Sequence, residues 1–518
     1  MDVDYLQSRV QWWKPPPLVL VLVSAAVAGL ALLPLGYVFW YAASLGPGDL
    51  RELLIRPRIG ELLVNTLALL VGVVAACVAL GTACAWLVER TDVPLKPVWH
   101  VLFAAPLAVP AFVNSYGWVS LTHGVQSYLG AVLIVTLSYF PLVYLPMVAA
   151  LRGLDPAHEE VAYSLGKSRL SVFRSVVLPG ARPALLGGAL LVGLHVLAEF
   201  GALQMLRFPT FTTAIYDHYR SAFNSAPANV LACVLVLGCL VLLMAELRLR
   251  GDVALWRVGR GSARPVEPMA LGRAKPLAVL GMATVAVVAL GVPLASLTRW
   301  LVVGSSTAFP VGELAAAAAT TLGLGVGAAV LATAMALPVA WLAGRHRGVL
   351  ANVIERCTFA AHALPGIVVA LALVAISIRT VRPLYQTLPL LLIGYAILFL
   401  PRALVSIRGS LAQAPPLLDD VARSLGSGRI KAFWRVTMPL IGPGVGAGAA
   451  LVFLAVSTEL TATLLLAPLG TSTLATEFWS DSSSVRYGAA APYALLLILI
   501  SMPATYILSR QTRGSDDR

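Results

Sequence analysis

Long apolar runs alternate with short polar segments along this chain. Most runs contain about 20 or more residues, which is the length that an α-helix needs to cross the hydrocarbon core of a bilayer. Strands of a membrane barrel would alternate polar and apolar residues over about ten positions. The pattern therefore predicts an all-α integral membrane protein with about twelve transmembrane helices. The predicted spans are 18–44, 59–88, 98–122, 127–150, 184–204 and 227–246, followed by 276–303, 314–343, 351–378, 385–407, 443–466 and 488–508.

The composition supports the same class of protein. Hydrophobic residues make up 59% of the chain and charged residues only 12%, against about 25% charged residues in soluble domains. The first apolar run follows Arg9 and Lys14 and is longer than the core of a typical signal peptide, which has roughly 7–15 residues. We therefore expect an uncleaved first helix, with the lipid bilayer as the surroundings of the chain.

The basic residues predict how the spans are oriented. Lys and Arg collect in the cytoplasmic loops of membrane proteins. With a cytoplasmic N-terminus, nine of the 37 Lys and Arg fall in outer segments and the other 28 in cytoplasmic ones. Twelve spans then place both termini in the cytoplasm. The same rule accounts for the net charge of +13, so we expect no nucleic-acid partner.

One charged segment of the sequence occurs twice in similar form. The chain reads EEVAYSLGKSR at 159–169 and DDVARSLGSGR at 419–429. Glu159–Pro183 aligns with Asp419–Pro443 without a gap, and ten of these 25 positions are identical. We predict a six-helix unit that is duplicated in parallel and fused. The first unit is 1–246, a basic cytoplasmic linker is 247–275, and the second unit is 276–518.

A nucleotide-binding P-loop is one interpretation of the repeated segment, because the letters GKS at 166–168 match the end of that motif. The motif also needs a glycine five residues before its last one, and Val161 occupies that position. The second copy reads GSG at 426–428 and has no lysine. We therefore exclude nucleotide binding by this chain.

A solvated loop explains the charges of the repeated segment but not the repetition of its small and apolar residues. A helix–turn–helix that docks into a partner explains both. Glu160, Ala162 and Tyr163 are then expected to share a helical face with Gly166, which allows close approach of the backbone. Pro179 is expected to end this unit and Pro183 to open the next span.

The repeated segment resembles the EAA loop of ABC-importer permeases, which has E-A-A, three residues, G, nine residues and I-x-L-P. The loops extend over about 152–183 and 408–443. Val161 and Val421 replace the middle small residue, which is a mild departure. The residues that correspond to the pattern are Glu159, Glu160, Ala162, Gly166, Leu178 and Pro179 in the first copy, and Asp419, Asp420, Ala422, Gly426, Met438 and Pro439 in the second.

This resemblance implies a type I ABC importer permease fold in a bacterial inner membrane. Each loop would form a coupling helix on one subunit of a cytoplasmic ABC ATPase homodimer, and a periplasmic substrate-binding protein would deliver the cargo. ATP and magnesium would bind the partner ATPase. We expect this chain to bind no cofactor, to have no catalytic residues and to be a transport subunit rather than an enzyme.

Charged groups inside the spans are the candidates for the translocation path, because each is expensive to place in a bilayer. Glu199 and Glu459 occupy equivalent positions in the two halves, and His195 lies four residues before Glu199. Carboxylates facing a path would favour a hard cation. The alternative is that both glutamates form hydrogen bonds at helix ends or between helices. No metal site is firmly assigned.

The stretches 198–219 and 458–479 resemble the corresponding regions of ferric-iron permeases, so ferric iron is the expected cargo. Thiamine, phosphonate and polyamine permeases are relatives, and these cargoes stay open. Tyr216 and Tyr219 are better placed in a docking surface for the binding protein than among iron ligands. A proton-driven secondary transporter with the two glutamates as relay, and a membrane scaffold or sensor, are the competing classes.

Overall fold

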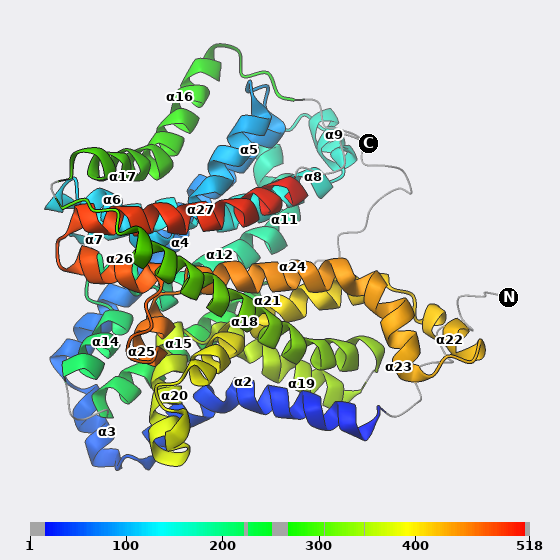
Figure 1. Ribbon diagram of the computed structural model, residues 1–518. Coiled ribbons are helices and arrows are strands. Elements are labelled where there is room, and N and C mark those ends of the chain that lie inside the picture. Colours follow the sequence, from blue (N-terminus) through cyan, green and yellow to red (C-terminus); the bar gives the residue numbers. More distant parts are fainter. Residues whose placement is uncertain (1–15, 222–225, 251–267, 305, 347, 513–518) are drawn as a thin grey trace. The chain divides into compact units, whose positions relative to one another are not determined.

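Helices account for nearly all of the structure. The computed structural model describes residues 16–221, 226–250, 268–304, 306–346 and 348–512 (Figure 1). In these ranges the only β-type pairing is an isolated bridge between Thr91 and Met269. The expected all-α fold is thus confirmed.

Seven helical runs in the described ranges are long and apolar enough to cross a membrane, and four bent pairs raise this number to eleven if each pair is one span. The predicted twelfth span corresponds to α27 (Tyr487–Thr512), whose apolar part Tyr487–Pro503 is shorter. The seven runs are α2 (Leu18–Ser44), α4 (Pro57–Arg90), Ala226–Glu246 of α15 (Ala226–Arg250), Gly272–Val303, α18 (Val311–Arg345), α21 (Leu388–Gln413) and Phe433–Ser457.

The bent pairs correct the expectation of continuous spans at 98–122 and 351–378. The first of these is bent by 91° and the second by 106°. Pro110 and Pro365 stand at the two bends; proline lacks an N–H donor and disfavours helical backbone in the residue before it. The pairs are Lys96–Ala108 with α6 (Ala111–Val119), α7 (Tyr128–Tyr139) with α8 (Pro141–Gly153), Phe173–Gly180 with α12 (Arg182–Ala198), and Val349–Ala363 with α20 (Gly366–Thr380).

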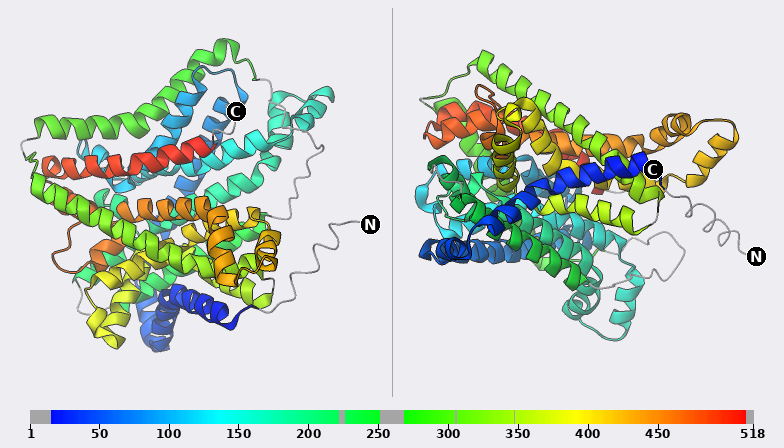
Figure 2. Two further views of the ribbon diagram at one scale, coloured as in Figure 1. Left: turned by 45° about the vertical axis from the view of Figure 1, so that its right-hand side comes forward. Right: turned by 90° about the horizontal axis from the view of Figure 1, so that it is seen from below.

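The helices form two compact units. Unit 1 contains Met1–Leu50 and Val311–Thr476, and unit 2 contains Arg51–Pro310 and Glu477–Arg518. In unit 1, α2 packs against α18, α19 (Val349–Ala360) and α20 (Figures 1 and 2). Helix α2, from the first half of the sequence, therefore packs with helices from the second half, so the compact units do not coincide with the sequence repeats. The linker 247–275 has its residues 251–267 outside the described part of the chain.

Close packing of three helices forms the centre of unit 2. There α4 packs against α8 and α12. Gly81 of α4 and Gly188 of α12 both lie against Val143 of α8, so closely that an added Cβ would come within 2.9 Å of it. Small residues allow this approach in membrane helices, where dispersion contacts replace the hydrophobic drive for association. In unit 1, α18, α21 and α24 (Met438–Ser457) form the corresponding group.

Candidate functional site

The first charged loop is a helix, a turn and a bent second helix. Helix α9 (Pro156–Ser164) begins at Asp155, whose carboxylate accepts a hydrogen bond from the N–H of Ala157 at 3.1 Å. After the turn come α10 (Arg169–Val172), a π-helical turn and α11 (Leu178–Gly180). The second loop repeats this order with α22 (Pro416–Ser424), α23 (Arg429–Ala432) and a π-helical turn that leads into α24. The expected helix–turn–helix is present in both halves.

Both turns depend on a glycine with left-handed backbone. Gly166 has φ +78°, and its N–H donates to the carbonyl of Tyr163 at 2.9 Å. The next N–H, of Lys167, donates to the carbonyl of Ala162 at 3.2 Å. This is the Schellman arrangement, which satisfies the last carbonyls of a helix. Gly426 has φ +84° and makes the corresponding bonds in the second loop.

The structure corrects the helical face that was expected to include Gly166. Helix α9 ends at Ser164, so Gly166 does not continue a helical face with Glu160 and Tyr163, and Ala162 is buried. No other atom of the chain lies within 4 Å of a Cβ added at Gly166 or Gly426. The glycines are needed by the turn, and the space in front of them is open.

Apolar side chains stand exposed at the tips of the loops. Val161 and Leu165, one helical turn apart, are 59% and 75% exposed. Val421 and Leu425 repeat them, with Leu425 80% exposed. Large apolar side chains exposed on a charged loop indicate a surface that contacts a partner. We call these four residues the loop tips.

The first acid of the first loop faces inward. Glu159 is 6% exposed, and its carboxylate lies 2.9 Å from Nη2 of Arg90, the last residue of α4. The same nitrogen donates to the carbonyl of Leu151 at 3.0 Å. Burial raises the pKa of Glu159, while the charge of Arg90 opposes this shift. Nε and Nη1 of Arg90 are buried and have no hydrogen-bond partner among the described residues, so the pair is only partly satisfied.

The second loop is held in the same way by different groups. Asp419 lies 3.4 Å from Nη2 of Arg345, the last residue of α18. The Asp419 carboxylate also accepts a hydrogen bond from the hydroxyl of Thr437. Arg345 donates to the carbonyl of Ala414 at 3.0 Å. We call each Arg–acid pair, Arg90–Glu159 and Arg345–Asp419, a clasp.

An aromatic pair accompanies each clasp. The rings of Trp86 in α4 and Phe173 after α10 are 4.8 Å apart and meet edge to face. Trp341 in α18 and Phe433 after α23 repeat the contact at 5.2 Å. Edge-to-face contacts are a favoured aromatic geometry. Each loop is thus attached to the end of one long helix by an ion pair and a ring pair.

The other residues of the EAA pattern divide by exposure. Glu160 is exposed, whereas its counterpart Asp420 is half-buried and lies 3.6 Å from Arg423. Pro179 lies in α11, one residue before the helical run Phe173–Gly180 ends, and Pro183 lies at the start of α12; both positions agree with the expectation. The exposed residues are Glu160, Gly166, Pro179, Gly426 and Pro439, and the half-buried ones are Leu178, Asp419, Asp420, Ala422 and Met438.

Glu199 lies where the fifth predicted span is interrupted. Helix α12 ends at Ala198, and the short helix α13 (Gly201–Met205) follows. The carboxylate accepts the N–H of Ala202 at 2.8 Å and the hydroxyl of Tyr139. The continuous span expected at 184–204 is therefore wrong, because the glutamate side chain replaces the helical bonds at the break. His195 lies with Nδ1 2.7 Å from the carbonyl of Leu191.

Glu459 lies at the equivalent break between α24 and α25 (Thr461–Leu466), within the predicted span 443–466. Its carboxylate accepts the N–H of Ala462 at 2.8 Å. The position of Tyr139 is occupied by Phe399 in this half, and the charge of Arg402 interacts with Glu459 instead. The hydrogen-bonding role considered for both glutamates is present in the structure. A role of Glu199, Glu459 and His195 in translocation stays a prediction.

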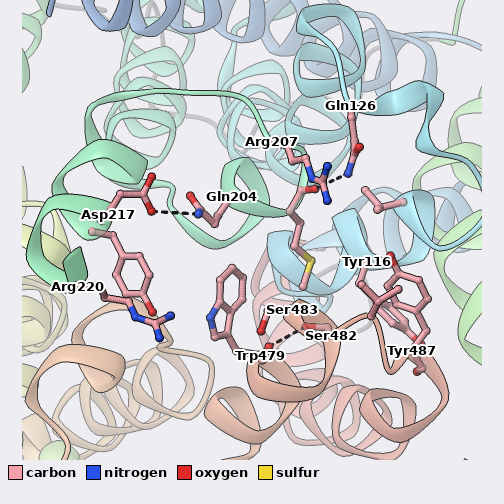
Figure 3. Close-up of a pocket in the computed structure, with 14 residues that line it drawn as sticks. Tyr116, Gln126, Gln204, Arg207, Asp217, Arg220, Trp479, Ser482, Ser483 and Tyr487 are labelled. Carbon is pink, nitrogen blue, oxygen red and sulfur yellow. Dashed lines mark hydrogen bonds between the residues drawn. The ribbon is translucent and has the colours of Figure 1, made fainter. Parts of the chain in front are cut away.

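A pocket of about 540 Å³ lies within unit 2, beyond the end of α12 that is remote from the first loop (Figure 3). Tyr216 lines it, together with Arg207 and Arg220. Among the described residues, no group of three or more His, Cys, Asp or Glu is arranged to hold a metal ion.

Several of these partners were not identified from the sequence. Arg90 and Arg345 follow Trp86 and Trp341 by four residues, so extending the repeated AWL letters would have found them. The repeat does not point to Tyr139 or Arg402, because an apolar residue stands at the equivalent position of each in the other half.

Comparison with known proteins gives two kinds of match. The family described as "Binding-protein-dependent transport system inner membrane component" matches residues 68–249 and 336–514. The Fe(3+)-transport system permease protein FbpB 2 of Haemophilus influenzae is 39% identical over 96% of this chain and 99% of its own length. The ferric transport system permease protein FbpB of Actinobacillus pleuropneumoniae is 24% identical over 76% of this chain and 60% of its own. The sulfate transport system permease protein CysT of Salmonella typhimurium is 29% identical over 32% of this chain and 67% of its own.

Proposed function

This chain belongs to the family of inner membrane components of binding-protein-dependent transport systems, and we propose that it is the permease subunit of an ATP-driven importer of ferric iron. The assignment of ferric iron as the cargo rests on the 39% identity with an Fe(3+)-transport permease over nearly the whole of both chains. The sulfate, molybdenum and phosphonate permeases match 24% to 44% of this chain.

Each loop acts as a coupling helix on one subunit of a cytoplasmic ABC ATPase homodimer. The loop tips support this role, because an amphipathic helix that projects valine and leucine suits an apolar groove on another protein. The tips occur twice, and a homodimer offers two equal grooves. Neither a proton-driven transporter nor a membrane scaffold or sensor needs duplicated tips of this kind.

The clasps carry the movement of the loops to the spans. When the ATPase subunits close on ATP and magnesium, each loop is displaced with its groove. The ion pair and the ring pair bind the loop to the end of α4 in unit 2 and of α18 in unit 1. Displacement of the loops therefore moves both long helices, which gives alternating access.

The orientation follows from the same assignment. The loops face the cytoplasm, where 28 of the 37 Lys and Arg then lie, and both termini are cytoplasmic. A periplasmic binding protein delivers the cargo to the opposite side.

Uptake of labelled ferric iron tests the proposal. A strain that lacks this chain is compared with the same strain carrying the chain, and labelled thiamine is measured in parallel. We expect the chain to restore iron uptake and to leave thiamine uptake unchanged. Restored thiamine uptake with unchanged iron uptake would overturn the cargo while leaving the ABC importer in place.

A further inference from the structure

The pocket of unit 2 is built from segments that come together at one end of its helices (Figure 3). Tyr116 comes from α6, Gln204 from α13, Tyr216 from α14 (Phe211–Ser221), and Trp479 from α26 (Leu474–Ser483). Its volume of about 540 Å³ lies in the range of sites for small molecules, roughly 300–1,000 Å³.

Two arginines give the pocket a positive charge. Arg207 and Arg220 lie on different sides of it, with Trp479 between them in the view of Figure 3. Neither guanidinium forms an ion pair with any carboxylate in the part of the chain that the structure describes. Arg220 lies over the ring of Tyr216 at 5.8 Å. The acid in the lining, Asp217, accepts a hydrogen bond from Gln204 at 3.3 Å.

Arg207 occupies a backbone position that does not suit it. Its φ is +52°, in the left-handed region that residues with a Cβ rarely adopt. The segments LRFPTFTT at 206–213 and LGTSTLAT at 469–476 correspond. In both, a threonine N–H donates to the hydroxyl of the threonine three residues on, at 2.9 Å. The second half places Gly470 at this position, with φ +83°.

The fold therefore does not require an arginine here, and glycine serves the same turn in the other copy. Val485, which also lines the pocket, is a second non-glycine residue with positive φ, at +61°. Residues held in such conformations gather at functional sites. A strained arginine that points its charge into a pocket indicates that the charge has a ligand.

We infer that this pocket binds a small anion that carries carboxylate or phosphate oxygens. Guanidinium groups bind such oxygens with paired, charge-assisted hydrogen bonds. The same two charges repel a bare trivalent cation. This inference rests on the proposed cargo: ferric iron reaches the pocket coordinated by an anion, and not as the naked ion.

Binding of citrate and of inorganic phosphate to the purified full-length chain in lipid nanodiscs tests the inference by calorimetry. We expect saturable binding to the wild type of at least one of these probes. Arg207→Gly and Arg220→Gln are each expected to weaken it by roughly tenfold or more, since each removes a charged donor. Arg207→Lys keeps the charge and is expected to retain part of the affinity. Absence of saturable binding to the wild type, or wild-type affinity in both Arg207→Gly and Arg220→Gln, would overturn the inference.

Repeat-matched variants separate ligand binding from folding. Arg207→Gly relieves the backbone, so we expect a higher melting temperature together with the loss of citrate binding. Gly470→Arg places the same strain in the other half, so it is expected to lower the melting temperature and to leave citrate binding unchanged. A loss of binding in Gly470→Arg equal to that in Arg207→Gly would assign the effect to general destabilisation and overturn the inference.

Uptake assays with these variants test the anion-site inference separately from the proposal of ferric iron as the cargo. Wild-type chain that binds citrate without restoring iron uptake would overturn the ferric-iron proposal and support the anion site. Iron uptake that is equal in wild type and Arg207→Gly, with no anion binding in either, would overturn the anion site and leave the cargo standing.

Discussion

Each of the two charged loops is attached by an ion pair and a ring pair, but the two ion pairs are not equally buried. In the first clasp, the side chains of Arg90 and Glu159 are 4% and 9% exposed. In the second, those of Arg345 and Asp419 are 11% and 20% exposed. The shorter acid also leaves a longer separation, 3.4 Å against 2.9 Å.

A second ion pair stands at the start of each loop, built from different residues in the two halves. Glu89, next to Arg90, lies 2.8 Å from Arg152 and 3.0 Å from Nε2 of His100. The aligned positions in the second half hold Gly344, Ala412 and Glu355, and there Glu355 lies 3.0 Å from Arg408.

This difference teaches that duplicated loops need not be equally stiff. Breaking a buried ion pair by removing one partner costs about 3–5 kcal/mol, because a buried charge is left alone. A pair that keeps more contact with solvent costs less to break, because the remaining charge is partly hydrated. We therefore expect the first loop to follow its long helix rigidly and the second to yield more. Two identical ATPase subunits would then meet unequal loops.

The largest effect is expected at the loop tips, which are alike in both halves. Leu165→Asp combined with Leu425→Asp places a charge in each of the apolar contacts that we propose with the ATPase. We expect iron uptake to fall about 100-fold, which corresponds to about 2.7 kcal/mol of lost docking. Copurification of the ATPase with the chain from solubilised membranes is the direct measurement, and the amount of chain in the membrane is the control. Full uptake with both charges present would contradict the docking of the tips.

The comparison of the clasps is tested by paired variants. Arg90→Leu strands Glu159 in a buried place, so we expect a loss of about 3–5 kcal/mol of local stability. Arg345→Leu should lose less, about 1–3 kcal/mol, because Asp419 keeps the hydroxyl of Thr437 and some solvent. Hydrogen exchange of the backbone at 156–180 and 416–440 measures both. Equal acceleration of exchange in the two variants would remove the proposed difference in stiffness.

The two interrupted spans provide a second paired test. Glu199→Gln keeps a partner for Tyr139, so we expect a loss of about 1 kcal/mol. Glu459→Gln leaves the charge of Arg402 without its opposite charge, and we expect the larger loss, about 1–3 kcal/mol. Thermal unfolding of the purified variants measures the difference, and adding Arg402→Met to Glu459→Gln is expected to recover most of it. A larger loss in Glu199→Gln would contradict the assignment of partners.

The same two variants combined test the translocation path. If both carboxylates face the cargo, iron uptake in the double variant falls well below that of either single variant. Wild-type uptake in a folded double variant would mean that both glutamates have only a structural, hydrogen-bonding role.

The sequence predicted the helical class, the repeat and the positions of the loops, because these depend on local hydrophobicity and on letters that recur. It located Glu199 and Glu459 at equivalent sites but not the breaks, which depend on each side chain reaching the next N–H. It could not find that the charge of Arg402 interacts with Glu459, since the two residues are 57 positions apart in the sequence. The left-handed turn at Gly166 was not predicted, because glycine near a partner and glycine in a left-handed turn look the same in a sequence.

Substitutions of the turn glycines provide the last test, and they decide between those two roles of the glycine. Gly166→Ala adds one carbon in open space but forces a Cβ into left-handed backbone, at about 1–2 kcal/mol. Gly166→Asn adds a larger side chain that tolerates this backbone better. If only the turn matters, Asn retains more uptake and ATPase copurification than Ala, and Gly426 gives the same order. If the ATPase surface touches the glycine, we expect Asn to be the more harmful of the two. That result would support the close approach predicted from the sequence. Because the second clasp holds its loop less firmly, the substitutions at Gly426 should have the smaller effect.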